Sequence, residues 1–227
     1  MRANDDTVRQ RLDGLIAEFD THAAAFDSAV ALEDDRQLGS HRRTIRLRRE
    51  LGSIDAAIDD EAFVEMLYRT IQQWGIGRRG SHIVSLPTFY ESLIAHRSEL
   101  VELDGLSIED DGYDVAAIAS SVDRLIADLS IVENKARIVA GTKTLHHLVP
   151  DLVPPMDRAW TGAFFGWTSS DPQNNQTQIF ERSFVGLAEV ARTAKPGRLV
   201  GDGWRTCSTK ILDNALIGYC KSIGIGG

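Results

Sequence analysis

The segment from Gly141 to Trp160 contains the residue types that could do chemistry. It reads Gly141-Thr-Lys143 and, after an apolar stretch, Pro154-Pro-Met-Asp157-Arg-Ala-Trp160. Amines and carboxylates exchange protons with reacting groups, and so does histidine, which occurs twice between Lys143 and Asp157. This segment is therefore the first place to search for a functional site.

The order of these two motifs resembles the helix-hairpin-helix DNA glycosylase superfamily. In that family a Gly-x-Lys on the second helix of the hairpin is followed by a Pro-x-Asp that opens the next helix. The resemblance implies that Lys143 is the candidate nucleophilic amine and Asp157 the candidate catalytic carboxylate. The chain departs from the family pattern just before the lysine, where Ala136-Arg-Ile-Val-Ala-Gly141 stands in place of Leu-Pro-Gly-x-Gly.

The activity that the resemblance implies is removal of a damaged or modified base from double-stranded DNA, without a cofactor. Cleavage of an N-glycosidic bond builds positive charge on the sugar, which a nearby carboxylate stabilises. A lysine with a lowered pKa can attack C1′ and form a Schiff base. The target base would first be flipped out of the duplex into a pocket.

A second resemblance covers a longer run, Lys143-Thr-Leu-His-His-Leu-Val-Pro-Asp-Leu-Val-Pro-Pro-Met-Asp-Arg158. It looks like an uncharacterised bacterial family with the same helical plan, and it implies that this run and the loop from Trp74 to Gly80 belong to one site. The residues that we expect to contact substrate are His146, His147, Arg158, Trp160 and Trp74.

Each of these residues also has a structural interpretation. Asp157 could cap the start of a helix, Lys143 could be a surface lysine, and Trp160 could belong to the core. His146 and His147 are adjacent, so they point about 100° apart on a helix and are not expected to line one pocket. Neither their spacing nor their neighbours predict a metal site.

The distribution of charge restricts where DNA could bind. The net charge of -8 disfavours indiscriminate binding to a polyanion. Residues 41–100 and 131–227 have net charges of +1 and +3, however, so a basic face could be assembled from these two blocks. The predicted contacts to the DNA backbone are Arg42, Arg43, Arg46, Arg78, Arg79 and Gly141. The alternative is a solvated face on which arginines pair with Glu50, Asp55 and the acidic N-terminal segment.

Apolar residues recur at steps of three and four along most of the chain, which predicts an all-α fold of about eight helices. The predicted helices are one long N-terminal helix over 8–30, helices over 63–74, 87–100, 115–129 and 143–148, a helix that begins at about Met156, and helices over 178–194 and 211–219. We expect a single domain over 1–227, in which 1–130 and 131–227 could form two lobes with a cleft between them.

The composition indicates a cytoplasmic protein without membrane contacts. No run of 18 apolar residues is present, and the N-terminal residues lack the apolar core of a signal peptide. The two cysteines, Cys207 and Cys220, have no spacing typical of zinc ligands, and we expect both to be reduced.

Two further functional hypotheses remain open at this stage. One is a non-catalytic helical module that binds protein or nucleic acid, in which residues 143–158 form a packing motif. The other is an enzyme that uses His146 or His147 together with Asp157 as a base. The glycosylase hypothesis requires Lys143 and Asp157 to face one cleft bordered by the arginines of 42–49 or by Arg78 and Arg79.

Overall fold

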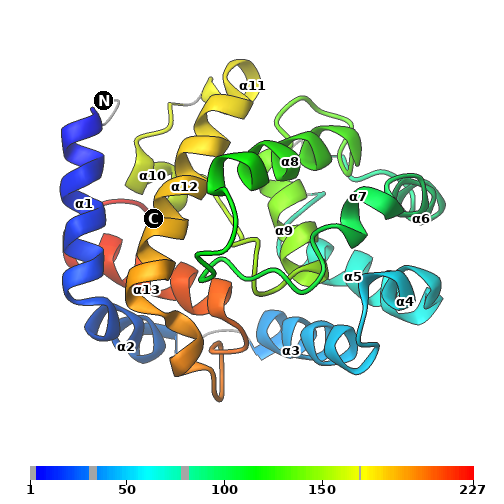
Figure 1. Ribbon diagram of the computed structural model, residues 1–227, viewed down its shortest axis with the longest axis horizontal. Helices are drawn as coiled ribbons and strands as arrows, with labels where there is room; N and C mark the ends of the chain where they lie inside the picture. The colour runs from blue at the N-terminus through cyan, green and yellow to red at the C-terminus, as the bar shows by residue number, and fades with distance from the viewer. Residues whose placement is uncertain (1–3, 31–34, 78–81, 169) are drawn as a thin grey trace.

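The computed structural model describes residues 4–30, 35–77, 82–168 and 170–227, and this part of the chain is all-helical, as predicted (Figure 1). Within these residues there is no strand, and a single isolated antiparallel bridge joins Ile83 to Val132. The elements in chain order are α1 (Asp5–Ala17), α2 (Phe19–Val30), α3 (Asp35–Glu50), α4 (Ile54–Asp59), α5 (Glu61–Gln73), α6 (Leu86–Ala95), α7 (Arg97–Val101), α8 (Val115–Asp128), α9 (Ile138–Leu148), α10 (Thr161–Phe165), α11 (Asp171–Asn174), α12 (Gln176–Ala194), the 3-10 helix η1 (Pro196–Leu199) and α13 (Ser208–Ser222).

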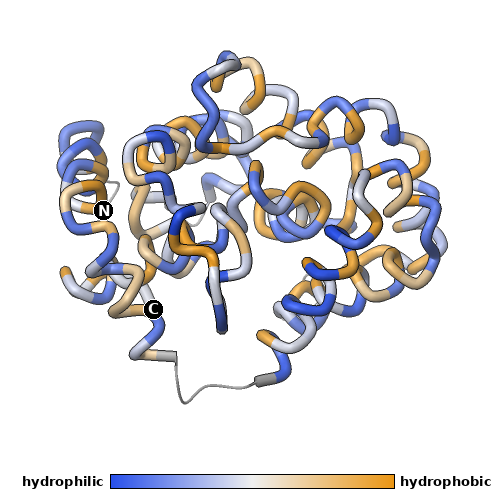
Figure 2. Tube along the Cα trace, turned by 60° about the horizontal axis from the view of Figure 1, so that its bottom comes forward, coloured by the Kyte–Doolittle hydropathy of each residue, from blue (hydrophilic) through white to orange (hydrophobic). Residues whose placement is uncertain are grey.

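Three helices closely follow the predicted ranges, namely α5, α8 and α12. Two of them begin with an aspartate whose side chain accepts a hydrogen bond from a free backbone N–H. The carboxylate of Asp60 accepts from the N–H of Phe63 at 2.7 Å, and that of Asp114 accepts from the N–H of Ala116 at 2.9 Å. Along most helices, apolar and polar residues alternate in short groups (Figure 2), as expected where one face packs inward.

The predicted long N-terminal helix was wrong, because the chain leaves helical geometry at Glu18 (φ -127°, ψ 35°) and forms two helices, α1 and α2. The break turns α2 so that it packs along α13. The helix predicted over 87–100 is likewise two, α6 and α7, which meet at His96. Tertiary packing has overridden a continuous apolar pattern in the first of these cases.

The helix predicted to begin at Met156 was also wrong. Residues 153–157 are non-helical, and α10 begins only at Thr161. The reason lies at Asp157, whose side chain accepts a hydrogen bond from the N–H of Trp160 at 2.7 Å and whose carbonyl accepts from Gly162 at 2.9 Å. These bonds stabilise a turn ahead of the helix.

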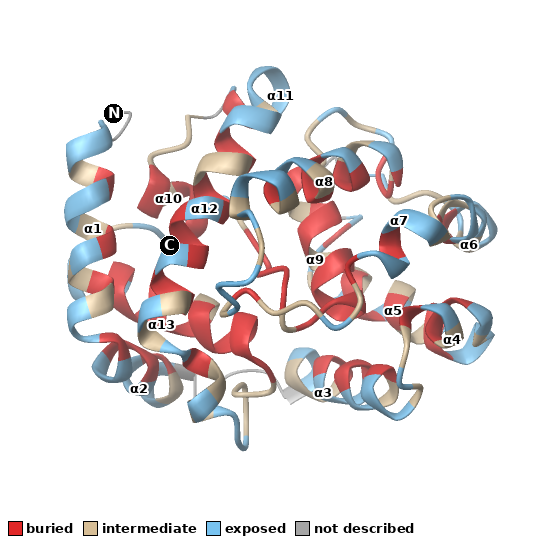
Figure 3. Ribbon diagram, viewed as in Figure 1, coloured by how far each residue is buried: buried red, intermediate tan, exposed pale blue. Residues whose placement is uncertain are grey.

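The two most buried helices are α9 and α13, whereas α1, α4 and α6 expose one side to solvent (Figure 3). Helix α9 packs against α3, α5 and α8, and α13 packs against α2, η1, α10 and α12. One hydrophobic core connects these elements and contains residues from Val8 in α1 to Cys220 in α13. None of the described helices has the length and apolar character that a membrane span requires.

Two glycines allow the helices to approach closely. A Cβ atom at Gly218 in α13 would lie 2.0 Å from the carbonyl oxygen of His22 in α2. A Cβ atom at Gly141 in α9 would lie 2.7 Å from a methyl carbon of Ile126 in α8. Gly141, predicted to contact a DNA phosphate, is instead buried at this helix crossing, so its role is packing.

Substitution of Gly218 by alanine is expected to lower the free energy of unfolding by about 3 kcal/mol, because α2 and α13 must separate to admit the methyl group. The control is Gly112→Ala, since a Cβ atom at Gly112 would have no neighbour within 4 Å. Its expected change is within about 0.5 kcal/mol. Urea unfolding of the two variants would measure both values, and equal stabilities would refute the close approach.

Candidate functional site

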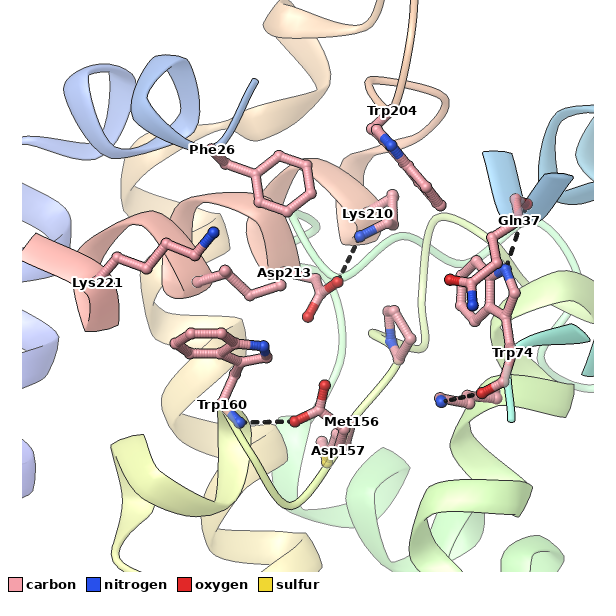
Figure 4. Close-up of a pocket in the computed structure, with 13 residues that line it drawn as sticks. Phe26, Gln37, Trp74, Met156, Asp157, Trp160, Trp204, Lys210, Asp213 and Lys221 are labelled. Atoms are coloured by element: carbon pink, nitrogen blue, oxygen red, sulfur yellow. Dashed lines mark hydrogen bonds and ion pairs between the residues drawn. The ribbon is translucent and has the colours of Figure 1, made fainter. Parts of the chain in front are cut away.

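A pocket of about 340 Å³ lies between α13, the segment 155–160 and the neighbouring ends of α2, α3 and α5 (Figure 4). Its volume is in the range of about 300–1,000 Å³ that is typical of small-ligand sites. Four residues predicted from the sequence line it: Lys143, Asp157, Trp74 and Trp160. Further lining residues with aromatic or charged side chains are Trp204, Lys210, Asp213 and Lys221.

Asp157 is held in a fixed orientation at the floor of the pocket. One carboxylate oxygen accepts a hydrogen bond from the backbone N–H of Trp160 at 2.7 Å. The other oxygen points into the pocket toward Asp213 (Figure 4). Asp157 was interpreted from its position as a cap or as a catalytic group, and the geometry accommodates both roles, because one oxygen binds the turn and the other faces the pocket.

Lys143 is partly buried in the wall of the pocket. Its Nζ donates a hydrogen bond to the carbonyl oxygen of Trp74 at 2.8 Å and lies 5.8 Å from the centroid of the indole ring. Burial lowers the pKa of this amine, and the negative charges of Asp157 and Asp213 partly oppose that shift. The structure therefore brings the predicted amine and the predicted carboxylate into one pocket.

A second carboxylate, that of Asp213, faces Asp157 across the pocket (Figure 4). Its Oδ2 lies 2.6 Å from the Nζ of Lys210, which also donates to the side-chain oxygen of Asn214 at 2.6 Å. Burial raises the pKa of Asp213, the cation of Lys210 lowers it, and the charge of Asp157 raises it further. The site thus contains two carboxylates in different electrostatic environments.

Aromatic rings form the walls of the pocket. The Nζ of Lys210 lies 4.9 Å from the ring centroid of Trp204 and 5.1 Å from that of Phe26, and the Nζ of Lys221 lies 5.7 Å from Trp160. Cations at these distances are attracted to the faces of the rings. Flat aromatic walls next to charged groups suit a planar ligand that carries hydrogen-bonding edges.

The two predicted histidines do not line this pocket. His146 and His147 are fully buried, and their ring centroids are 5.0 Å apart. Both rings contact a third, His41 of α3, with centroid separations of 5.4 and 5.1 Å. Burial lowers the pKa of all three, that of His147 to about 4, so they are neutral near pH 7.

The predicted DNA contacts on α3 are exposed and lie beside the pocket. Arg42, Arg43 and Arg46 line a neighbouring surface depression together with residues 200, 201 and 206 of the loop that also contains Trp204. Arg46 lies 3.6 Å from Glu50, which is the exposed pairing that the alternative interpretation expected.

The other basic residues that the sequence singled out do not lie in the pocket or are not described by the structure. Arg158 is exposed and is not part of the pocket lining. Arg78 and Arg79 lie outside the described residues. The pairing expected between the arginines of α3 and Asp55 is not seen, because Asp55 pairs with Arg97 at 3.0 Å.

Sequence reasoning missed Asp213, Lys210, Trp204 and His41. Lys210 and Asp213 are three residues apart and both lie on α13, which places them on one face, but the helix predicted over 211–219 began one residue after Lys210. Trp204 lies in a glycine-containing loop with no pattern around it, and His41 was counted only as the start of a basic run. No protein-family model, curated protein or solved structure matches this chain.

The pair formed by Lys210 and Asp213 is nearly inaccessible to solvent, with side-chain exposures of 5% and 11%. Substitution of Lys210 by methionine leaves a buried carboxylate without its cation and is expected to cost about 3–5 kcal/mol of stability. The double variant Lys210→Met/Asp213→Leu should recover most of this loss.

The matched control for this pair is Arg46→Ala, which removes an exposed pair and should cost less than about 1 kcal/mol. Urea unfolding of the four proteins, including the wild type, gives the comparison. A loss for Lys210→Met no larger than that for Arg46→Ala would contradict the importance of the buried pair.

Proposed function

We propose that this protein cleaves the N-glycosidic bond of a modified base in double-stranded DNA, with the base bound in the pocket. The observation that supports the proposal is the meeting of Lys143 and Asp157 in one pocket with aromatic walls. Lys143 belongs to α9, and Asp157 belongs to the turn before α10. They are the two residues to which the resemblance to helix-hairpin-helix glycosylases assigns the nucleophile and the catalytic carboxylate.

The pocket-facing oxygen of Asp157 is suited to the transition state. As the bond between C1′ and the base lengthens, positive charge grows on the sugar, and a fixed carboxylate stabilises it without having to reorganise. The N–H of Trp160 holds this carboxylate in place at 2.7 Å. The ground-state substrate lacks that charge, so the interaction lowers the barrier rather than merely strengthening binding.

The amine of Lys143 can act as the nucleophile. Its nitrogen forms a bond to C1′ while the bond between C1′ and the base breaks, and the base leaves with the electron pair. The amine then gives up a proton and the departing base receives one, so that atoms and charge balance. Opening of the sugar ring gives a Schiff base between Lys143 and the sugar.

Asp213 is placed to relay that proton. It faces Asp157 and is paired with Lys210, so as a carboxylate it can accept the proton that the amine of Lys143 releases and pass it to the leaving base; burial raises its pKa, which favours that acceptance. In this arrangement the two carboxylates have separate roles, because Asp157 stabilises charge and Asp213 transfers a proton. His146 and His147 have no part in this chemistry, since neither lines the pocket.

The exposed arginines of α3 give the duplex a place to bind. Gln37 of the same helix lines the pocket, so phosphates that contact Arg42, Arg43 and Arg46 would lie close to its opening. Backbone contacts of this kind position the DNA and make its affinity depend on salt. The acidic segment 101–130, which does not line the pocket, would repel DNA from its part of the surface.

Release of a base is the decisive measurement for this proposal. Duplexes that each carry one of a set of modified bases are incubated with the protein, and abasic sites are scored. We expect release from at least one duplex, and a loss of about 10²–10³-fold in rate for Asp157→Asn. The control Asp202→Asn removes an exposed carboxylate from the neighbouring loop and should leave the rate unchanged.

Release at the wild-type rate by Asp157→Asn would overturn the proposal, and so would the absence of release from every duplex. Duplex binding without release would favour the non-catalytic module instead.

Borohydride reduction tests the covalent step separately. It should trap a protein–DNA adduct for the wild type and for Lys135→Gln, an exposed lysine outside the pocket, and no adduct for Lys143→Gln. An adduct that persists in Lys143→Gln would assign the nucleophile to another amine. Base release without any adduct in the wild type would show that water, rather than Lys143, attacks the sugar.

A further inference from the structure

Directly behind the tryptophans of the pocket, three buried histidines form a cluster that the proposed function does not use. His41 belongs to α3, and His146 and His147 belong to α9. One ring nitrogen from each lies within 4.8 Å of those from the other two. The ring of His41 stacks on Trp204 at 5.7 Å, and the ring of His146 stacks on Trp74 at 5.8 Å.

Hydrogen bonds to carbonyl groups settle which nitrogens of α9 hold protons. The Nδ1 of His147 lies 2.7 Å from the carbonyl oxygen of Lys143. The Nδ1 of His146 lies 3.1 Å from the carbonyl oxygen of Val153 and 3.0 Å from the hydroxyl of Thr209, which gives its own proton to the carbonyl of Pro150. A carbonyl oxygen can only accept, so both Nδ1 atoms donate. Because these imidazoles are neutral, each Nε2 holds a free lone pair.

One of these two lone pairs has no partner. The Nε2 of His147 lies 3.0 Å from the Nδ1 of His41, which can donate to it. The Nε2 of His146 is completely buried and has no hydrogen-bond partner within the described structure. A buried polar atom left unpaired is costly, and proteins rarely tolerate one unless something else uses the group.

We propose that His41, His146 and His147 bind a divalent transition-metal ion of the zinc class. The ligand atoms are the Nε2 atoms of His146 and His147 and the Nδ1 of His41. In a tetrahedral site with Zn–N bonds of about 2.0–2.1 Å, these nitrogens would lie about 3.4 Å apart. Two of them are already 3.0 Å apart and all three lie within 4.8 Å of one another, so rotation of the rings on binding has to close the longer separations.

The opposite nitrogen of every ring already has an acceptor, as metal-binding histidines require. These acceptors are the carbonyl oxygens of Lys143 and Val153 and, for the Nε2 of His41, the hydroxyl of Thr206 at 2.6 Å. Such outer contacts fix the tautomer and the ring direction of a ligand. Only His41 has to change tautomer, moving its proton from Nδ1 to Nε2, when the ion binds.

The ligand set also selects the kind of ion. Three imidazoles without a carboxylate suit zinc, copper, nickel or iron, whereas magnesium and calcium require oxygen ligands. The cations whose charges act on these histidines have partners elsewhere, Lys143 the carbonyl of Trp74, Lys210 the carboxylate of Asp213 and Arg49 that of Asp151. The bound ion joins α3 to α9 behind Trp74 and Trp204, and its presence does not depend on the reaction proposed for the pocket.

The experiment measures metal binding by tag-free protein that has been stripped with a chelator. Zn²⁺ is titrated in competition with a chromophoric chelator, and Co²⁺ is added separately to follow the visible absorption of a tetrahedral site. We expect one equivalent of Zn²⁺, no effect of Mg²⁺ in excess, and a rise in melting temperature with Zn²⁺. Failure to bind one equivalent would overturn the proposal.

Two variants locate the site. His146→Gln should weaken Zn²⁺ binding by about 100-fold or more, while His82→Gln, an exposed histidine outside the cluster, should bind as the wild type does. If His146→Gln does not fold, Thr206→Val tests the site instead. Loss of the hydrogen bond between the Thr206 hydroxyl and His41 should weaken Zn²⁺ binding about 10–100-fold. Unchanged affinity in Thr206→Val, or in a folded His146→Gln, would place the ion elsewhere and refute the assignment.

Discussion

Helix α9 has almost no surface in contact with solvent, and this constraint accounts for much of what surrounds it. Nine of its eleven residues are buried. A polar side chain on such a helix must find its partner within the protein, because an unpaired polar group in the interior is costly. The hydroxyls of Thr142 and Thr144 donate hydrogen bonds to carbonyl oxygens of their own helix. The amine of Lys143 donates to the carbonyl oxygen of Trp74.

Trp74 contacts both Lys143 and the histidine cluster, which are the polar side chains of α9 discussed above. Its carbonyl oxygen accepts from Lys143, its indole lines the pocket, and its ring centroid lies 4.8 Å from that of His147. A change in the histidine cluster therefore alters the same aromatic wall against which a ligand would pack. Trp74 contacts both the pocket and the histidine cluster, although the proposed reaction does not use the cluster. The position of Trp74 must therefore suit both sets of contacts.

Local sequence patterns predicted the helices whose starts and apolar faces are determined by residues close together in the sequence. Helices α5 and α8 begin at aspartate caps, and α12 has a clear apolar period. The resemblance to helix-hairpin-helix glycosylases assigned Lys143 and Asp157 to one site. The break at Glu18 could not be predicted, because it depends on the contact between α2 and α13, which are distant in sequence. Asp213, Trp204 and His41 were missed for the same reason, since each reaches the site from a separate segment that only folding brings close.

The close contact between His22 and Gly218 also has a consequence for how the chain folds as it is made. Helix α2 ends at Val30 and its partner α13 begins at Ser208, so α2 is synthesised well before α13. At about 5–20 residues per second, roughly ten seconds or more separate the two. During that interval the face of α2 that packs along α13 lacks this partner, and exposed apolar surface of this kind makes an incomplete chain prone to aggregation until α13 emerges.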